Sequence, residues 1–223
     1  MKFFQKFVLP LLILTFIVAL AVFLAYQFQL IPHCSFSSED FGIIPYQSPF
    51  DADQDGLDDQ TDLLISARTY LATKPRYKSQ YYATGYPNDN YGVCTDVVAF
   101  ALLGTGYDLQ TLFHHDLIDH PDAYDIPTPD QNIDFRRTPN LEIFFSRHAE
   151  NLTTELSDPA DWQPGDLVIF DHAHIAILSD LRNSRGFPFL LHHHSPFQIR
   201  YEEDSLSSYG KITSHFRLQP LEQ

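Results

Sequence analysis

The most regular hydrophobic pattern of the chain is a long apolar run near its N-terminus. Residues 7–31 contain no charged side chain, and residues 8–26 are almost continuously apolar. A helix over residues 8–26 is about 28 Å long at 1.5 Å per residue, which matches the hydrocarbon core of a bilayer. The pattern therefore predicts a single transmembrane helix within residues 1–31.

A cleaved signal peptide is the main alternative for this run, because Ala19-Leu20-Ala21 resembles a small-x-small cleavage site. The run is longer than the roughly 7 to 15 apolar residues of a signal peptide and continues past that site, so we favour an uncleaved anchor. Lys2 and Lys6 precede the run and no basic residue follows it closely. The positive-inside rule then places the N-terminus in the cytoplasm and the chain after residue 31 outside the membrane.

The rest of the chain alternates between helical and strand patterns. Four segments repeat apolar residues at helical spacing, and three apolar runs separated by turn residues are typical of buried strands. The expected helices cover residues 63–71, 94–103, 108–118 and 141–148, and the expected strands cover residues 167–170, 174–178 and 187–193. We predict an α+β fold, with helices packed on an antiparallel sheet. A linker over residues 32–66 separates this domain, residues 67–223, from the anchor.

Net charge excludes one class of partner. The 223 residues include 14 lysines and arginines against 29 aspartates and glutamates, which gives a net charge of −15. Removing the two positive charges of the N-terminal lysines leaves −17 for the outer part. Such a field repels phosphate backbones, and no basic patch reverses it locally. We therefore expect no nucleic-acid partner.

The linker contains an acidic loop, residues 51–62, with the spacing of a calcium-binding loop. Acidic residues stand at loop positions 1, 3, 5, 9 and 12, and a glycine at position 6 allows the sharp turn that such loops require. This half EF-hand predicts a structural Ca²⁺. The expected ligands are Asp51, Asp53, Asp55, the carbonyl of Leu57, Asp59 through water, and Asp62 at the closing position. The alternative is a solvated acidic turn that caps the next helix.

Cys94 is the candidate nucleophile. It follows Gly92 and Val93 and opens an apolar helix, where free backbone N–H groups and the helix dipole favour a thiolate. Two alternatives are a small buried hydrophobic residue and a disulfide with Cys34, the other cysteine of the chain.

Histidines on neighbouring strands are the candidate partners of that cysteine. His174 begins one expected strand, and His192 and His193 end the next. A thiol hydrolase needs one imidazole to take the thiol proton and a second group to orient that ring. The alternative is a zinc metallohydrolase, since imidazoles on adjacent strands suit Zn²⁺. Its candidate ligands are His172, His174, His192, His193 and His194.

A polar loop, residues 130–140, supplies second-tier candidates. Asp134, Arg136 and Arg137 either lock this loop by ion pairs or present a bidentate fork to a substrate carboxylate. We include all three as candidate substrate-binding residues.

Five ordered motifs between about Ala67 and Leu218 resemble a known family. They are Gly92-Val93-Cys94-Thr95-Asp96, Asp108-Leu109-Gln110, Asn132-Ile133-Asp134 with Arg136-Arg137, Pro139-Asn140-Leu141 and Pro164-Gly165-Asp166. The chain resembles the YijF-like family of uncharacterised bacterial envelope proteins. That family in turn resembles the NlpC-type, papain-like cysteine hydrolases, whose hallmark is a proline-glycine-aspartate turn, a strand, a histidine-led strand and a further strand that ends in a polar residue.

The resemblance implies a papain-like fold and roles for three residues. Cys94 is expected to be the nucleophile, His174 the base and His192 the orienting residue, with His193 as the alternate for the third position. It also implies an enzyme of the bacterial cell membrane that acts on amide bonds of cell-wall peptidoglycan, with no cofactor for catalysis. A non-catalytic cell-wall-binding module of the same fold is the remaining alternative.

Overall fold

The computed structural model describes residues 2–221, with side chains from residue 7 onward. The chain divides into two compact units, one up to Cys34 and one from Ser35 onward. Helix α1 (Lys2–Gln27) makes up most of the first unit. It includes a stretch, Phe7–Gln27, with a mean hydropathy of 3.0 and no buried residue. This confirms the N-terminal apolar helix, which by its length and composition could be a membrane anchor or a signal sequence.

The second unit is built around a six-stranded antiparallel sheet with strand order β3-β8-β4-β5-β6-β7. The three expected strands form a meander, because β4 pairs with β5 and β5 pairs with β6. The third strand is shorter than expected and ends before the histidines. The strands are β3 (Glu150–Asn151), β4 (Leu167–Phe170), β5 (His174–Arg182), β6 (Pro188–Leu191), β7 (Glu202–Glu203) and β8 (Ile212–Arg217).

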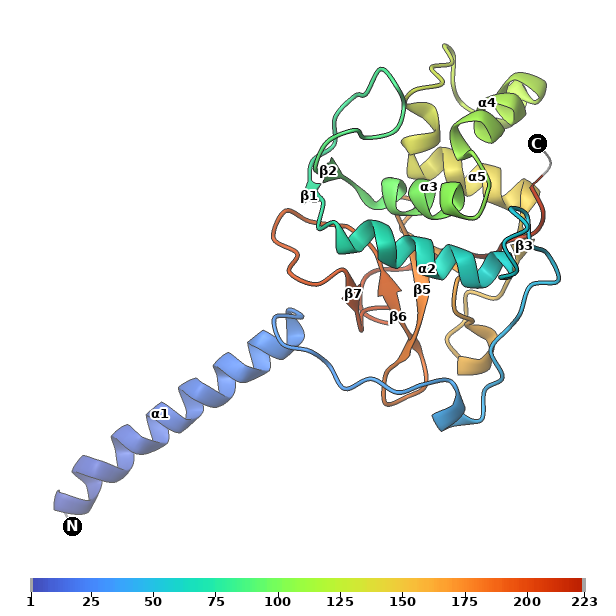
Figure 1. The fold of residues 1–223 in the computed structure, drawn as a ribbon. Helices are drawn as coiled ribbons and strands as arrows, with labels where there is room; N and C mark the ends of the chain where they lie inside the picture. The colour runs from blue at the N-terminus through green and yellow to red at the C-terminus, as the bar shows by residue number, and fades with distance from the viewer. Residues whose placement is uncertain (1, 222–223) are drawn as a thin grey trace. The chain divides into compact units, whose positions relative to one another are not determined.

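Four helices of the second unit agree with the predicted helical segments, and each starts within four residues of the predicted position. They are α2 (Asp59–Ala72), α3 (Cys94–Gly104), α4 (Leu109–Asp119) and α5 (Thr138–His148). Figure 1 shows α2 and α3 side by side over strands β5 and β6. Two short strands, β1 (Arg76–Tyr77) and β2 (Tyr91–Gly92), pair in parallel just before α3. Short 3₁₀ helices occur at Glu39–Phe41, Pro121–Ala123, Asp134–Arg136 and Pro159–Asp161.

Two hydrophobic clusters cover the two faces of the sheet. Alternate residues of β5 point to opposite faces, as strand geometry requires. Ile175 and Ile177 belong to the larger cluster, which also contains the buried faces of the helices. Ala176 and Leu178 belong to the smaller cluster, which is built around Trp162. The α+β class is therefore confirmed, with the helical layer on one face of the sheet.

Residues 35–58, which precede α2, lie within the second unit. Phe36 exchanges two backbone hydrogen bonds of 2.8 Å with Arg182, at the end of β5. Arg182 is fully buried, and its guanidinium donates to Ser38 Oγ and to the backbone carbonyls of Pro159, Trp162 and Gly186. These bonds attach the start of the second unit to the C-terminal end of β5.

Candidate functional site

Cys94 is the first residue of α3, and the local sequence fixes its position. The preceding residue, Val93, is extended, and its N–H donates to Asp96 Oδ2 at 2.8 Å, which caps the helix. Gly92 is needed because a Cβ there would lie 2.1 Å from the Tyr70 hydroxyl. The strand β2 and the capped helix therefore deliver the thiol at a defined turn.

The Cys94 thiol is held in a half-buried setting against the sheet. Its sulfur lies 3.9 Å from Thr138 Oγ1, at the start of α5, and also interacts with the backbone N–H of Ile175. Burial raises the pKa of the thiol, although both of these contacts lower it. The helix N-terminus alone predicts a thiolate, but desolvation of the sulfur has the larger effect, so a base is needed to remove its proton.

Three side chains form a hydrogen-bonded series, which we call the histidine relay: His174, His192 and Glu203. His174 Nε2 lies 2.9 Å from His192 Nδ1, and His192 Nε2 lies 3.2 Å from Glu203 Oε2. His174 begins β5, His192 directly follows β6, and Glu203 ends β7, so three adjacent strands supply the three groups. The side chains of all three residues are nearly or completely buried.

Electrostatics fix the protonation of the histidine relay. Burial acts to raise the pKa of Glu203, but hydrogen bonds from His192 and His194 outweigh it and lower that pKa to about 2. Burial lowers the pKa of both His174 and His192, and neighbouring imidazoles lower that of His174 further. At neutral pH the relay therefore consists of two neutral imidazoles and one carboxylate.

That charge state determines which ring nitrogens carry protons. A carboxylate only accepts hydrogen bonds, so His192 Nε2 must carry a proton and His192 Nδ1 must be an acceptor. His174 Nε2 then donates to His192, which leaves the lone pair of the neutral His174 ring on Nδ1. No hydrogen bond among the described residues engages His174 Nδ1. The relay thus ends in a free proton acceptor.

The thiol and the histidine relay are each linked to the start of β5, the thiol through Ile175 and the relay through His174. The sulfur interacts with the N–H of Ile175, the residue that follows His174. Tyr209 packs on the His174 ring with centroids 4.4 Å apart, and after burial the Cys94 thiol is the largest cause of the raised pKa of Tyr209.

Cys94 and His174 nevertheless contact different cores. Cys94 packs against the larger hydrophobic cluster, whereas Phe170 and Tyr209, which contact the His174 ring, belong to the smaller one. Within the described part of the chain, no hydrogen bond joins the thiol to an imidazole. Catalytic hydrogen bonds in free enzymes are often long and shorten only when substrate binds.

The other histidines of the cluster lie in different surroundings. His193 points into the larger cluster, where its ring lies 5.2 Å from those of both Tyr77 and Tyr201. His172 is exposed and bonds to Glu142 at 2.7 Å. His194 lies 4.8 Å from the His192 ring, and its Nε2 is 3.6 Å from Glu203 Oε2. The structure therefore joins His192, and not His193, to His174.

One group of side chains in this region has the donors and spacing for a transition metal. The ligand atoms of His192, His194 and Glu203 lie within 4.8 Å of one another. Two imidazoles and one carboxylate form a set that binds Zn²⁺ or related divalent ions. His174 would then orient His192 from outside the coordination sphere.

The second-tier candidates of residues 130–140 are mostly bonded within the protein. Arg136 forms a buried bidentate pair with Asp96, with N–O distances of 2.6 and 2.9 Å, and also donates to the Gln80 carbonyl. Asp134 is buried and accepts from the backbone N–H of Asp130 at 2.6 Å. Arg137 is exposed, so of these three residues it is the one whose charge is accessible to a ligand.

The acidic loop, residues 51–62, packs against the helical layer and leads into α2. Asp59 Oδ1 accepts from the backbone N–H of Ala52, and its Oδ2 accepts from the Tyr107 hydroxyl at 2.8 Å. Both carboxylate oxygens of Asp59 are therefore already engaged. Burial, followed by the charges of Asp55, Asp53 and Asp51, raises the pKa of Asp62 to about 6.

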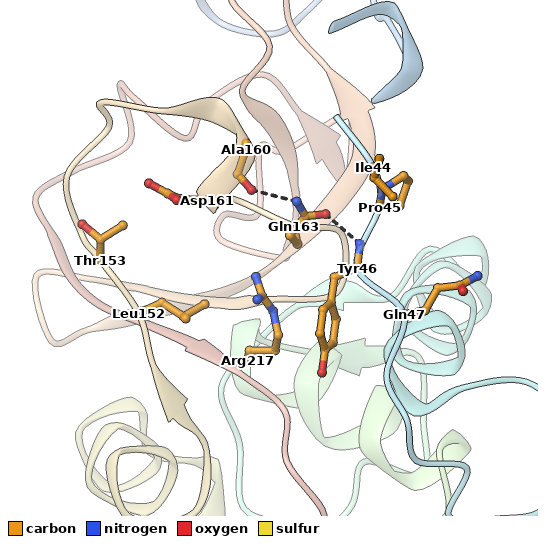
Figure 2. Close-up of a pocket in the computed structure, with 10 residues that line it drawn as sticks. All are labelled: Ile44, Pro45, Tyr46, Gln47, Leu152, Thr153, Ala160, Asp161, Gln163 and Arg217. Atoms are coloured by element: carbon orange, nitrogen blue, oxygen red, sulfur yellow. Dashed lines mark hydrogen bonds between the residues drawn. The ribbon is translucent and has the colours of Figure 1, made fainter. Parts of the chain in front are cut away.

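A surface pocket lies elsewhere in the second unit. Figure 2 shows Gln163 at its centre, accepting from the backbone N–H of Tyr46 and donating to the Ala160 carbonyl. Arg217 lies over the Tyr46 ring at 4.5 Å and forms an ion pair with Asp166. The residues that line this pocket belong neither to the histidine relay nor to the surroundings of Cys94.

Sequence reasoning missed Glu203, Thr138 and Tyr209. Glu203 lies in a two-residue strand without a recognisable pattern, and it reaches His192 only through the pairing of β6 with β7. Thr138 and Tyr209 are single residues in no motif. The triplet of histidines at residues 192–194 was the available signal that a charged partner must lie nearby.

Fold and site define a mixed α+β domain that follows an apolar N-terminal helix and carries a cysteine at a helix start and buried, hydrogen-bonded histidines on its sheet. Comparisons with known proteins assign it to a family. The model of a domain of unknown function, DUF1287, matches residues 64–218. The uncharacterized protein YijF of Escherichia coli (strain K12) is 36% identical over 171 residues, which cover 70% of this chain and 82% of that protein. The chain belongs to the DUF1287 family. No solved structure matches it.

Proposed function

We propose that this protein is a membrane-anchored, extracytoplasmic cysteine hydrolase that cleaves amide bonds in peptidoglycan stem peptides. The observation that carries the proposal is the histidine relay on the sheet that the Cys94 helix packs against. It ends in the unoccupied acceptor His174 Nδ1, and the thiol interacts with the adjacent residue, Ile175. The same order of a cysteine at a helix start, a histidine at a strand start and a polar residue on the next strand supports a relation to the NlpC-type hydrolases.

The proposed reaction begins with transfer of the thiol proton to His174 Nδ1. The sulfur attacks the amide carbonyl carbon, and the carbonyl oxygen becomes an oxyanion that accepts a hydrogen bond from the Cys94 N–H at the helix start. The C–N bond then breaks, and His174 returns the proton to the leaving amine. Water, deprotonated by His174, attacks the resulting thioester, which releases the carboxylic acid and restores the thiol.

His192 and Glu203 act in this scheme as positioning residues. Glu203 keeps the proton on His192 Nε2, and His192 in turn keeps the proton on His174 Nε2, so that the Nδ1 lone pair stays available. When His174 takes the thiol proton, the carboxylate stabilises the positive charge through His192. The proposed geometry includes a shortening of the Cys94–His174 separation when substrate binds.

Location follows from the N-terminal helix. In the proposal α1 spans the membrane with its N-terminus in the cytoplasm, and residues 35–223 lie next to the cell wall. The apolar stretch Phe7–Gln27 and the two lysines before it support this orientation. Arg137, the exposed arginine of the polar loop, is then placed to meet a carboxylate of the wall peptide.

Digestion of purified peptidoglycan tests the function. Full-length protein in detergent is incubated with wall sacculi, and released fragments are identified by mass spectrometry. We expect the wild type to release peptide fragments with a new free carboxyl group, and Cys94→Ala to release none. Cys34→Ala, which removes the other thiol, should act like the wild type. If Cys94→Ala still binds sacculi and the wild type never releases fragments, the chain is a binding module and the enzyme proposal is wrong.

A zinc-dependent hydrolase is the second candidate, favoured by the His192, His194 and Glu203 group with its ligand atoms within 4.8 Å. The two candidates predict opposite inhibitor profiles. A thiol hydrolase loses activity to iodoacetamide and keeps it in a chelator, because the cysteine is the nucleophile. A zinc enzyme loses activity to the chelator and regains it with added Zn²⁺, and alkylation of Cys94 leaves it active.

A further inference from the structure

The acidic loop concentrates negative charge without a positive partner. The carboxylate oxygens of Asp51, Asp53 and Asp55 lie within 4.8 Å of one another. All three side chains are exposed, and within the described part of the chain none of them forms an ion pair with a basic side chain. Gly56 turns the chain at a φ of +97°, which brings these carboxylates to one side of the loop.

A fourth carboxylate of the loop, at its closing position, is buried in the helix that follows. Asp62, in the first turn of α2, is only 5% exposed, and its Oδ2 is buried with no hydrogen-bond partner among the described residues. A buried, unpaired carboxylate oxygen is unfavourable unless a cation or a donor satisfies it. After burial, the charges of Asp55, Asp53 and Asp51 are the largest causes of the raised pKa of Asp62.

We propose that residues 51–62 bind one Ca²⁺ through the carboxylates of Asp51, Asp53, Asp55 and Asp62 and the backbone carbonyl of Leu57. These are hard oxygen donors at the loop positions that wrap this ion. Ca²⁺ would give the unpaired Asp62 oxygen its partner and remove the repulsion among the four carboxylates. Asp59 accepts hydrogen bonds from the Ala52 N–H and the Tyr107 hydroxyl and forms the wall of the site.

The position of the loop gives the ion a role in the fold. A Cβ on Gly106 would lie 3.1 Å from the Asp53 Cβ, so the loop packs closely on the turn between α3 and α4. Two residues before Asp62, Gln60 donates to the Pro164 carbonyl and to Asp166 Oδ1, at 2.8 and 2.9 Å. A bound Ca²⁺ therefore ties the segment before α2 to the helix that packs on the Cys94 helix.

Calcium titration and thermal melting of the full chain in detergent test the proposal. With the chelated protein as the reference, we expect calorimetry to show one saturable site and Ca²⁺ to raise the melting temperature by about 5 °C. Asp55→Asn and Asp62→Asn should each remove most of the rise. Asp122→Asn, a matched change at an exposed position outside the loop, should leave the rise intact.

Two results would overturn the calcium site. One is the absence of saturable binding up to about 10 mM Ca²⁺, a concentration above the weakest affinities of extracellular calcium modules. The other is equal binding by the wild type and Asp55→Asn, which would show that only the general negative charge attracts the ion. Asp55 is exposed, so this variant gives an answer even if Asp62→Asn fails to fold. The readouts need no activity, so they are independent of the hydrolase proposal.

Discussion

Two buried polar clusters of the second unit, the Arg136–Asp96 ion pair and the histidine relay, differ in how completely they are bonded. In the first, Arg136 uses Nε and Nη2 on Asp96 and Nη1 on the Gln80 carbonyl, and Asp96 also caps α3. In the second, the histidine relay, the series of hydrogen bonds ends at His174 Nδ1 without a partner among the described residues.

The difference between the clusters distinguishes a stabilising role from a chemical one. A fully bonded ion pair can hold the Cys94 helix in place, but it has no group left to react with another molecule. A relay that ends in an imidazole lone pair has the same burial and one unused acceptor. We therefore expect disruption of the first cluster to change stability and disruption of the second to change activity.

Removal of the proton acceptor should give the largest effect. We expect His174→Ala to lower the rate of peptide release from peptidoglycan by about 10³- to 10⁴-fold, because the thiol keeps its proton. His193→Ala is the control, since His193 is equally buried but joins the opposite face of the sheet. It should keep activity within a few-fold of the wild type. Equal losses in the two variants would contradict the assigned role of His174.

Disruption of the ion pair should mainly affect folding. Arg136→Met leaves the Asp96 carboxylate buried without its partner, and we expect the free energy of unfolding to fall by about 3–5 kcal/mol. Denaturant titration measures this change. Arg137→Met, at the neighbouring exposed position, should change stability by less than about 0.5 kcal/mol. Similar values for the two arginines would show that the pair does not support the helix.

A change at the far end of the histidine relay should have a smaller effect on the rate. Glu203→Gln keeps the shape but can donate to His192, so both histidines can adopt the opposite tautomer. We expect peptide release to slow by about 10²-fold while Cys94 remains reactive. Glu142→Gln changes the partner of the exposed His172 and should leave the rate unchanged. An unchanged rate in Glu203→Gln would remove Glu203 from the mechanism.

Stability should depend on pH in a direction set by the buried histidines. The pKa values of His174, His192 and His193 are lowered in the folded state, so below about pH 6.5 the unfolded state binds more protons. Their contribution to the free energy of unfolding is present above that pH and is lost as the pH falls toward the pKa values of the folded state. Each imidazole should contribute a slope of about 1.4 kcal/mol per pH unit below pH 6. Melting curves between pH 5 and 8 that show no such loss would contradict their burial as neutral groups.

Patterns local in sequence predicted most of the fold. Helical spacing located α2 to α5, and apolar runs between turn residues located the meander of β4, β5 and β6. The strand β8 was not anticipated, because its residues Ile212–Arg217 are mostly polar and it is identified only by pairing with β4. Pairings between distant segments leave little signal in a single sequence.

The candidate site was predictable only in part, for the same reason. Cys94, His174 and His192 stand at recognisable starts and ends of elements. The alternation of a strand could not decide between His192 and His193, because the strand ends at Leu191 and only the structure shows which ring turns toward His174. Arg136 was a candidate for substrate binding because its partner, Asp96, lies forty residues away, and the sequence alone does not show that the two side chains pair.

The most direct test of the central claim is the rate at which iodoacetamide alkylates Cys94 at pH 7, followed by mass spectrometry in the wild type and in His174→Ala. Cys34, an exposed thiol in the other unit, is the internal control and should react at the same rate in both proteins. If His174 accepts the thiol proton, alkylation of Cys94 should slow by about tenfold or more in the variant. Equal Cys94 rates in the two proteins would contradict a working pair of thiol and imidazole.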